Sequence, residues 1–188
     1  AWIESNRSDV DKKTDGSVGY IYVTNTSING QSDLYRQFYG QMTKDALIID
    51  ERWNGGGQMP DRFVQLLNRP VSLHLFRRHE KEWRVPEVSH QGPKCMLING
   101  PAGSGGDLFP FLFKQAKVGK LIGTRTWGGV IGIFGNPQLI DGAYITAPNV
   151  TMYENDGTLT MEGHGVEPDI EVIDDPAIVA DFFNNEWR

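Results

Sequence analysis

The 188-residue chain is poor in the residue types that define several common protein classes. It has one cysteine, Cys95, inside an apolar run, so an internal disulfide is impossible and a buried structural thiol is expected. No apolar stretch reaches the length of a membrane span. Lys and Arg number 18 against 24 Asp and Glu, a net charge of −6. This balance disfavours a general nucleic-acid or anionic-membrane binder.

Histidine is also scarce, with four in the chain. The histidines and the cysteine show neither i, i+4 nor Cys-x-x-Cys spacing, so the sequence predicts no metal site. The glycine triplet Gly55-Gly56-Gly57 lacks the Gly-Lys-Ser/Thr ending of a P-loop, which disfavours nucleotide binding. We therefore expect no cofactor.

One glycine-rich stretch points to chemistry. Residues 100–107, Gly-Pro-Ala-Gly-Ser-Gly-Gly-Asp, separate an apolar run at 94–99 from apolar residues that recur at helical spacing. The pattern predicts a buried strand, a sharp turn and a helix over about 104–117. Ser104 would then lie at the positive end of the helix dipole, beside N–H groups without helical partners, a good place to stabilise an oxyanion. On this stretch alone, Ser104 is equally well a simple N-cap in a tight turn.

A similar pattern occurs earlier in the chain. The apolar run 46–50 ends in acid, which is typical of a central parallel strand, and the glycine triplet and a helical period through 63–67 follow it. Two such units predict right-handed β–α–β connections, with both glycine turns at the ligand-binding end of the sheet. We therefore expect the two turns to face each other across one site.

Shorter patterns predict the remaining elements. The opening residues 1–7 show no helix or strand period, 24–32 reads as a loop, and 78–91 as a charged, exposed excursion. The other predictions are strands at 18–23, 71–77 and 120–124, a helix from Ser32 to about Met42, a hairpin of 144–147 with 150–153, a turn-rich segment at 162–170 and a short helix at 176–183. Without repeats or an interdomain linker, one domain is expected.

A serine nucleophile needs a base, a group that orients the base, and an oxyanion hole. Ser104 can be the nucleophile, with the N–H of Gly105 and one N–H of the 55–57 turn as the hole. Glu162 is a candidate for the orienting acid. The base is harder to find.

None of the four histidines is a clear base. His74 alternates within an expected strand, and His79 and His90 flank a charged stretch and are expected to be solvated. His164, two residues after Glu162 in a glycine-flanked turn, is the best candidate within the chain.

Seven sequence blocks in succession resemble the tricorn-type serine peptidases, relatives of the tail-specific or C-terminal-processing peptidases. The blocks are Trp-Ile-Glu-Ser-Asn-Arg at 2–7, Val-Gly-Tyr-Ile-Tyr-Val at 18–23, Leu-Ile-Ile-Asp-Glu-Arg at 47–52, Asn-Gly-Gly-Gly at 54–57, Ser-Gly-Gly-Asp-Leu-Phe-Pro at 104–110, residues 119–129, and Gly-His-Gly-Val-Glu-Pro-Asp at 163–169. Their order and their spread over nearly the whole chain make the resemblance specific.

The resemblance implies an α/β, crotonase-like (ClpP/crotonase) fold of β-β-α units, with a largely parallel central sheet flanked by helices. It implies peptide-bond hydrolysis through an acyl-enzyme on Ser104, with Glu162 as the acid of a Ser-His-Ser-Glu tetrad. The oxyanion hole would use the N–H of Gly105 and that of Gly57, with Gly56 as second choice. Relatives usually carry Asp where this chain has Gly105.

In this family the catalytic histidine lies in a helical subdomain upstream of a PDZ domain, and both precede the first matching block. We therefore expect residues 1–188 to be the C-terminal, nucleophile-bearing domain of a longer peptidase, poorly active alone. The block match also places His164 away from the base position.

The expected partners are a peptide or unfolded-protein substrate, the upstream domains of the same polypeptide and, as in relatives, further copies of the chain in a homo-oligomer. Neither a nucleic acid nor a membrane span is expected. Archaeal relatives are cytoplasmic and bacterial ones can be periplasmic or exported, so the compartment stays open. A non-catalytic peptide-binding or scaffolding relative is the alternative function, and acyl-CoA chemistry on the same fold is a third.

Overall fold

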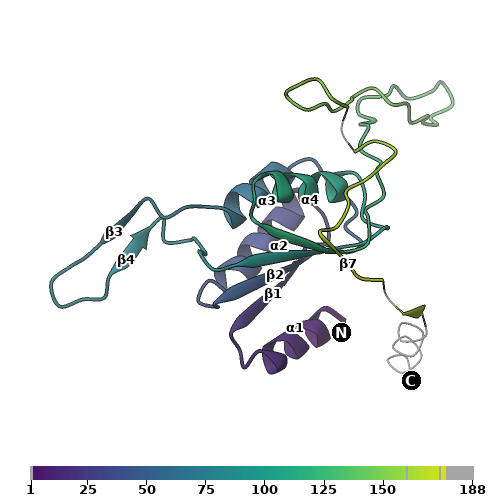
Figure 1. Cartoon of the computed structure of the whole chain (residues 1–188). Helices are drawn as coiled ribbons and strands as arrows, with labels where there is room; N and C mark the ends of the chain where they lie inside the picture. The colour runs from purple at the N-terminus through teal and green to yellow at the C-terminus, as the bar shows by residue number, and fades with distance from the viewer. Residues whose placement is uncertain (1, 160, 174, 177–188) are drawn as a thin grey trace.

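A parallel five-stranded sheet forms the centre of the molecule (Figure 1). The computed structural model describes residues 2–159, 161–173 and 175–176. Along the sheet, the strand order is β1-β2-β5-β6-β7, and all four neighbouring pairs are parallel. The strands are β1 (Val18–Tyr22), β2 (Ala46–Asp50), β5 (Lys94–Ile98), β6 (Gly119–Gly123) and β7 (Ile170–Glu171). The predicted α/β class and parallel sheet are confirmed.

The core row of the sheet shows why these runs form strands. Ile21 pairs with Ile49, Ile49 with Met96 and Met96 with Leu121, and all four side chains are fully buried. Runs covered on both faces need apolar residues at nearly every position, because helices shield parallel sheets from water.

Helices α2 (Ile28–Tyr39), α3 (Pro60–Leu67) and α4 (Gly105–Gln115) cover one face of the sheet, and α1 (Trp2–Lys13) lies on the other side against β1 (Figure 1). Where α3 meets α4, Phe109 packs edge-to-face against Phe63, with 5.5 Å between the ring centres, and also against Phe113. Burying aromatic side chains of this size is worth several kcal/mol in total, by the usual ~1.5–3 kcal/mol per large apolar residue. None of the described helices has the length and apolarity needed to cross a membrane.

Helix α1 corrects the expectation that the opening residues lack regular structure. Its helical period is weak, and it has no fully buried residue. Tertiary contacts hold it instead: Trp2 packs edge-to-face on Tyr22 at 5.2 Å, and Asn6 donates to the Tyr20 hydroxyl at 3.1 Å. Packing against β1 therefore decides the conformation where the pattern does not.

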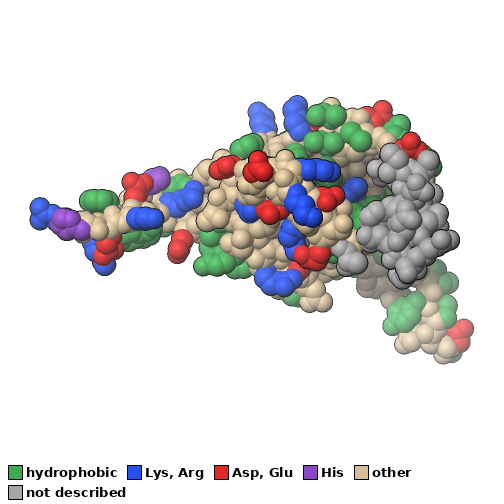
Figure 2. Space-filling model, turned by 90° about the horizontal axis from the view of Figure 1, so that it is seen from below, with side chains coloured by type: hydrophobic (Ala, Val, Ile, Leu, Met, Phe, Trp, Pro, Cys, Tyr) green, Lys and Arg blue, Asp and Glu red, His purple; other side chains and the backbone are tan. Residues whose placement is uncertain are grey.

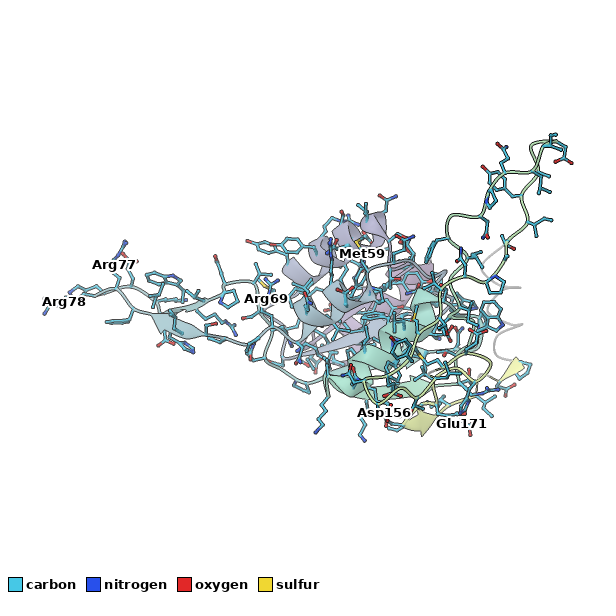
Figure 3. The ribbon with its side chains drawn as sticks, turned by 90° about the horizontal axis from the view of Figure 1, so that it is seen from above. Met59, Arg69, Arg77, Arg78, Asp156 and Glu171 are labelled. Atoms are coloured by element: carbon cyan, nitrogen blue, oxygen red, sulfur yellow. The ribbon has the colours of Figure 1, made fainter. Side chains whose placement is uncertain are left out.

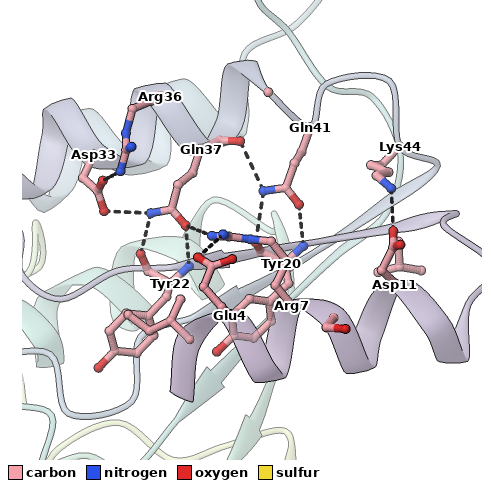
Figure 4. A pocket seen from close by; sticks show the side chains of 14 residues that line it. Glu4, Arg7, Asp11, Tyr20, Tyr22, Asp33, Arg36, Gln37, Gln41 and Lys44 are labelled. Atoms are coloured by element: carbon pink, nitrogen blue, oxygen red, sulfur yellow. Dashed lines mark hydrogen bonds and ion pairs between the residues drawn. The ribbon is translucent and has the colours of Figure 1, made fainter. Parts of the chain in front are cut away.

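The edge strand β1 is closed by two glutamine side chains, Gln37 on α2 and Gln41 in the turn that follows it (Figure 4). Gln41 accepts the Tyr20 N–H at 2.8 Å and donates to the Tyr20 carbonyl at 3.0 Å. Gln37 makes the same pair of bonds with Tyr22, at 3.1 and 2.9 Å. The amides take the place of a neighbouring strand and block the exposed edge. They line a cavity of about 660 Å³ whose charged side chains include the ion pair of Lys44 with Asp11.

Two segments project from the body. The first is an arm whose antiparallel strands are β3 (Leu73–Leu75) and β4 (Trp83–Val85), and Figure 2 shows it carrying basic, histidine and apolar side chains. The predicted strand at 71–77 is thus shorter, and part of the predicted excursion at 78–91 pairs with it. The second projection spans about 132–159 and contains isolated bridges between Gly132 and Val150 and between Tyr153 and Leu159.

Three further predictions need correction. Residues 144–147 and 150–153 do not pair as a hairpin, because 150 and 153 bridge to 132 and 159 instead. Helix α2 begins at Ile28 rather than Ser32, because Ser27 already takes the N-cap position with extended backbone. The turn-rich segment ends in a short strand, β7, paired with β6. The predicted helix at 176–183 lies almost wholly outside the described residues.

Candidate active site

Ser104 lies in the turn between β5 and α4, with its side chain exposed. Its backbone has φ 58° and ψ −115°, a region that L-residues rarely adopt, and its side chain makes no capping hydrogen bond. The N-cap interpretation therefore leaves this conformation unexplained. A strained non-glycine residue costs of order 1–3 kcal/mol and is typical of functional turns, including the serine turn between strand and helix in hydrolases.

The two predicted glycine turns meet at this serine. A Cβ added to Gly56 would lie 2.9 Å from the Ser104 Cβ, and a Cβ added to Gly105 would lie 2.6 Å from the Gly57 nitrogen and 2.1 Å from Thr26 Oγ1. Only glycine permits this approach of the two backbones. The contact also explains why position 105 is glycine here: Thr26 and the glycine turn fill the space that a side chain would need.

The N–H groups at this contact differ in their partners. The Gly56 N–H donates to Asn54 Oδ1 at 2.9 Å, so it is already engaged. Within the described part of the chain, no hydrogen bond is formed by the N–H of Gly57 or of Gly105. These two groups are therefore the ones available to a developing negative charge, whereas Gly56 is not.

Glu162 holds the loop at 126–131 through its carboxylate. Its Oε2 accepts the N–H groups of Val130 and Ile131 at 2.8 and 2.9 Å. Three residues into α4, the buried Asp107 accepts the N–H of Gly128 at 2.7 Å and of Gly129 at 3.2 Å. The 126–131 loop thus connects Glu162 with the helix that follows Ser104. No hydrogen bond joins the Glu162 and Ser104 side chains among the described residues.

A pocket of about 650 Å³ opens beside the serine. Its lining carries no charged side chain; the residues are Ser27, Ile28, Asn29, Gly57, Gln58, Met59, Ser104 and Phe134. Figure 3 shows Met59 over the body of the molecule, far from Arg77 and Arg78 at the end of the arm. The pocket can accept a neutral chain next to the serine hydroxyl.

The histidines lie apart from this pocket. His74 pairs with Glu82 on the arm, and His79 is exposed beyond it. His90 corrects the expectation of a solvated side chain: it is 4% exposed, its Nε2 bonds the Lys44 carbonyl at 2.8 Å, and burial lowers its pKa. The His164 backbone contacts Gly128. Of the residues described, no histidine side chain hydrogen-bonds Ser104 or lines the pocket.

Behind the two turns lies a group of buried polar residues that the sequence reasoning did not single out. They are Thr26, Glu51, Asn54 and Asp107, all fully buried. Burial, followed by the charges of Asp107 and Asp50, raises the pKa of Glu51 well above its ordinary value. The one available signal was the polar run Asp-Glu-Arg-Trp-Asn directly after an apolar strand. Among the described residues, no three His, Cys, Asp or Glu side chains are placed to hold a metal ion.

The chain is also similar in sequence to known proteins. Residues 17–172 match the model of peptidase family S41. The tricorn protease of Thermoplasma acidophilum is 38% identical over 173 residues, which is 92% of this chain and 16% of the relative. The putative tricorn-like protease C-terminal subunit of Sulfurisphaera tokodaii is also 38% identical, over 91% of this chain and 20% of the relative. The chain thus spans a fifth or less of these curated relatives.

Solved structures give the same fold. A crystal structure of the tricorn protease superimposes with a TM-score of 0.85 at 34% identity, covering 98% of this chain and 19% of that one. The photosystem II D1 C-terminal processing protease matches with a TM-score of 0.59 at 22% identity, covering 83% of this chain and 42% of that one. At this lower identity the second likeness concerns the fold alone.

Proposed function

Since the chain belongs to peptidase family S41, we propose that it is the nucleophile-bearing catalytic domain of a tricorn-like serine peptidase. One observation carries the proposal: an exposed serine at φ 58° adjoins two backbone N–H groups without partners in the described chain, those of Gly57 and Gly105. A nucleophile and a preformed oxyanion site are the two parts that acyl transfer needs in one place.

In the proposed reaction, Ser104 Oγ attacks the carbonyl carbon of the scissile peptide bond and its proton passes to a base. The carbonyl oxygen becomes an oxyanion that accepts the N–H groups of Gly57 and Gly105. Collapse of this intermediate breaks the C–N bond, and the amine leaves with the proton from the base. Water then hydrolyses the acyl ester and regenerates the serine.

The base is proposed to come from outside residues 1–188, from a histidine-bearing helical subdomain that a PDZ domain separates from this one. In support, one histidine pairs with Glu82 on the arm and His90 bonds the Lys44 carbonyl. None of the four histidine side chains, all among the described residues, lines the pocket. Glu162 would orient that histidine through its free oxygen, because Oε2 is held by the 126–131 loop.

The substrate is proposed to be a peptide or an unfolded protein, because the pocket beside Ser104 is uncharged and open. Contacts with the upstream domains, and with further copies of the chain, belong to the same proposal. Exposed apolar side chains on the arm support them, since Phe76 is 73% exposed and Leu73 48%.

The proposal is tested by trapping the acyl-enzyme in the polypeptide that contains this chain together with its upstream region. With a slowly hydrolysed peptide ester, mass spectrometry should find the acyl group on Ser104. Glu162→Gln should lower kcat about 10²–10⁴-fold, the usual contribution of positioned proton transfer, while Glu167→Gln in the same turn should leave it unchanged.

Two results separate the alternatives. Peptide binding without any acyl group would favour the non-catalytic scaffold, which keeps the fold and lacks turnover. Tight binding of an acyl-CoA would favour the third function. Either would overturn the peptidase assignment.

A further inference from the structure

Asn54 joins the two turns that form the site. Its backbone carbonyl accepts the N–H of Gly103, next to the serine, at 3.2 Å. Its side-chain Oδ1 accepts the N–H of Gly56 at 2.9 Å. The residue is fully buried, and a Cβ on Gly106 would lie 2.8 Å from its carbonyl oxygen. One residue thus bonds both turns and touches the first turn of α4.

The bond to Gly56 affects its neighbour directly. Gly56 has φ +86° and Gly57 φ +145°. Because both residues are glycines, no side chain fixes the orientation of either peptide plane. With the Gly56 N–H held by Asn54, the next N–H along the chain, that of Gly57, is left without a partner beside Gly105. Without Asn54, a buried N–H at Gly56 would lack an acceptor, and rotation of the turn would be the cheapest way to find one.

We propose that Asn54 is a positioning residue for the oxyanion hole: its carbonyl and its Oδ1 set the separation and direction of the Gly57 and Gly105 N–H groups. The inference rests on the proposed function, because it assigns a task only if an oxyanion forms at Ser104. Asn54 touches no substrate itself and acts through Gly56 and Gly103.

Glu51 supports this orientation of the amide. Because Oδ1 faces a donor, Nδ2 faces the other way, and the Asn54 amide is near enough to Glu51 to counteract part of the rise in its pKa. Among the described residues, neither Glu51 oxygen has a hydrogen-bond partner, and nor does Asn54 Nδ2. Burial raises the pKa of Glu51 and so favours its neutral form. A neutral acid beside the amide adds no charge behind the site, where a carboxylate would oppose the oxyanion.

A test compares three variants in the polypeptide with its upstream region. Asn54→Ala removes the acceptor for Gly56, Asn54→Ser keeps a neutral oxygen there, and Asn68→Ala is the control. Asn68 is an exposed amide at the C-terminal end of α3, outside both turns, and its Nδ2 donates to the Ala116 carbonyl at 3.4 Å. The measurements are kcat and KM on one peptide, the thermal midpoint, and the affinity for a peptide boronate that forms a tetrahedral adduct with Ser104.

The expected result is a split between kcat and KM. Removing one oxyanion donor costs about 10²–10³-fold in kcat, and displacing Gly57 should cost a similar factor in Asn54→Ala, with KM within about threefold. Boronate affinity should fall in parallel with kcat. Asn54→Ser should recover at least about a tenth of the wild-type kcat, and Asn68→Ala all of it.

Three results overturn the inference. An unchanged kcat in Asn54→Ala shows that the turns need no bridge. If Asn54→Ala does not fold, Asn54→Ser decides: a folded Ser variant with less than about one hundredth of the wild-type kcat excludes the acceptor role. A wild type that neither hydrolyses peptides nor binds the boronate removes the proposed function and this inference together, whereas an active wild type with insensitive variants removes the inference alone.

Discussion

The two strand–turn–helix units of this molecule share a topology and differ in how the turn is held. After β2, nine residues precede α3, and positive φ occurs at Trp53, Gly56 and Gly57, while Asn54 holds the N–H of Gly56. After β5, the turn is shorter, and a non-glycine residue, Ser104, takes the positive φ at the helix start. In the first unit, the two residues beside the serine that take positive φ are glycines, for which this conformation costs little. The second accepts strain to expose a hydroxyl.

Replacing Ser104 by glycine tests the second half of this comparison and should have the largest effect. Ser104→Gly and Ser104→Ala should both lower kcat at least about 10³-fold, because the nucleophile is lost. Only the glycine variant should gain stability, by about 1 kcal/mol or more, since it adopts φ 58° without strain. Denaturant unfolding of the two variants measures the difference. Equal stabilities would mean that the serine turn is not strained.

Adding a methyl group to Gly56 tests the first half. In Gly56→Ala, the Cβ would lie 2.9 Å from the Ser104 Cβ, so the variant should lose stability and about 10²-fold in kcat. Gly157→Ala is the matched control, because its φ of +87° is close to the +86° of Gly56 and no atom lies within 4 Å of the added Cβ. The control should lose stability through backbone strain alone and keep its kcat. A similar loss of kcat in both variants would contradict the close contact of the turns.

The buried Glu51 behind the first turn gives a smaller effect that depends on pH. Its pKa in the folded state lies well above that in the unfolded state, about 4.3, so the folded state binds more protons between the two values. The contribution of Glu51 to the free energy of unfolding is therefore largest below pH ~4.3 and falls as the pH rises toward the folded-state pKa. Glu51→Gln removes this fall, so the variant should gain on the wild type as pH rises from 4 to 7. Glu87→Gln, an exposed control, should show a constant difference.

The sequence predicted the sheet and the meeting of the two turns for a simple reason. Continuous apolar runs such as 46–50 and 94–98 can be buried only in the middle of a covered sheet, and glycines at fixed places after them leave few conformations for the connections. Parallel strands then bring both turns to the same edge. The contact between Gly105 and Gly57 follows from these local patterns.

The parts that the sequence did not predict depend on tertiary contacts. Helix α1 is held by Trp2 on Tyr22, and His90 is buried by its bond to Lys44, and neither contact has a local pattern. The proposed preference for Gly57 over Gly56 as donor likewise required the direction of the Asn54 amide. Buried polar residues such as Glu51 look like surface residues in a sequence, because composition alone does not give their neighbours.

The most direct test of the account is fluorophosphonate labelling with peptide mapping, on residues 1–188 and on the polypeptide that includes the upstream region. The account predicts that Ser104 is labelled in the longer polypeptide and at most weakly in the shorter one, since no histidine side chain hydrogen-bonds it among the residues that the structure describes. His164→Ala should leave labelling of the longer form unchanged. Strong labelling of the short chain that is lost in His164→Ala would place the base inside the chain and contradict the account.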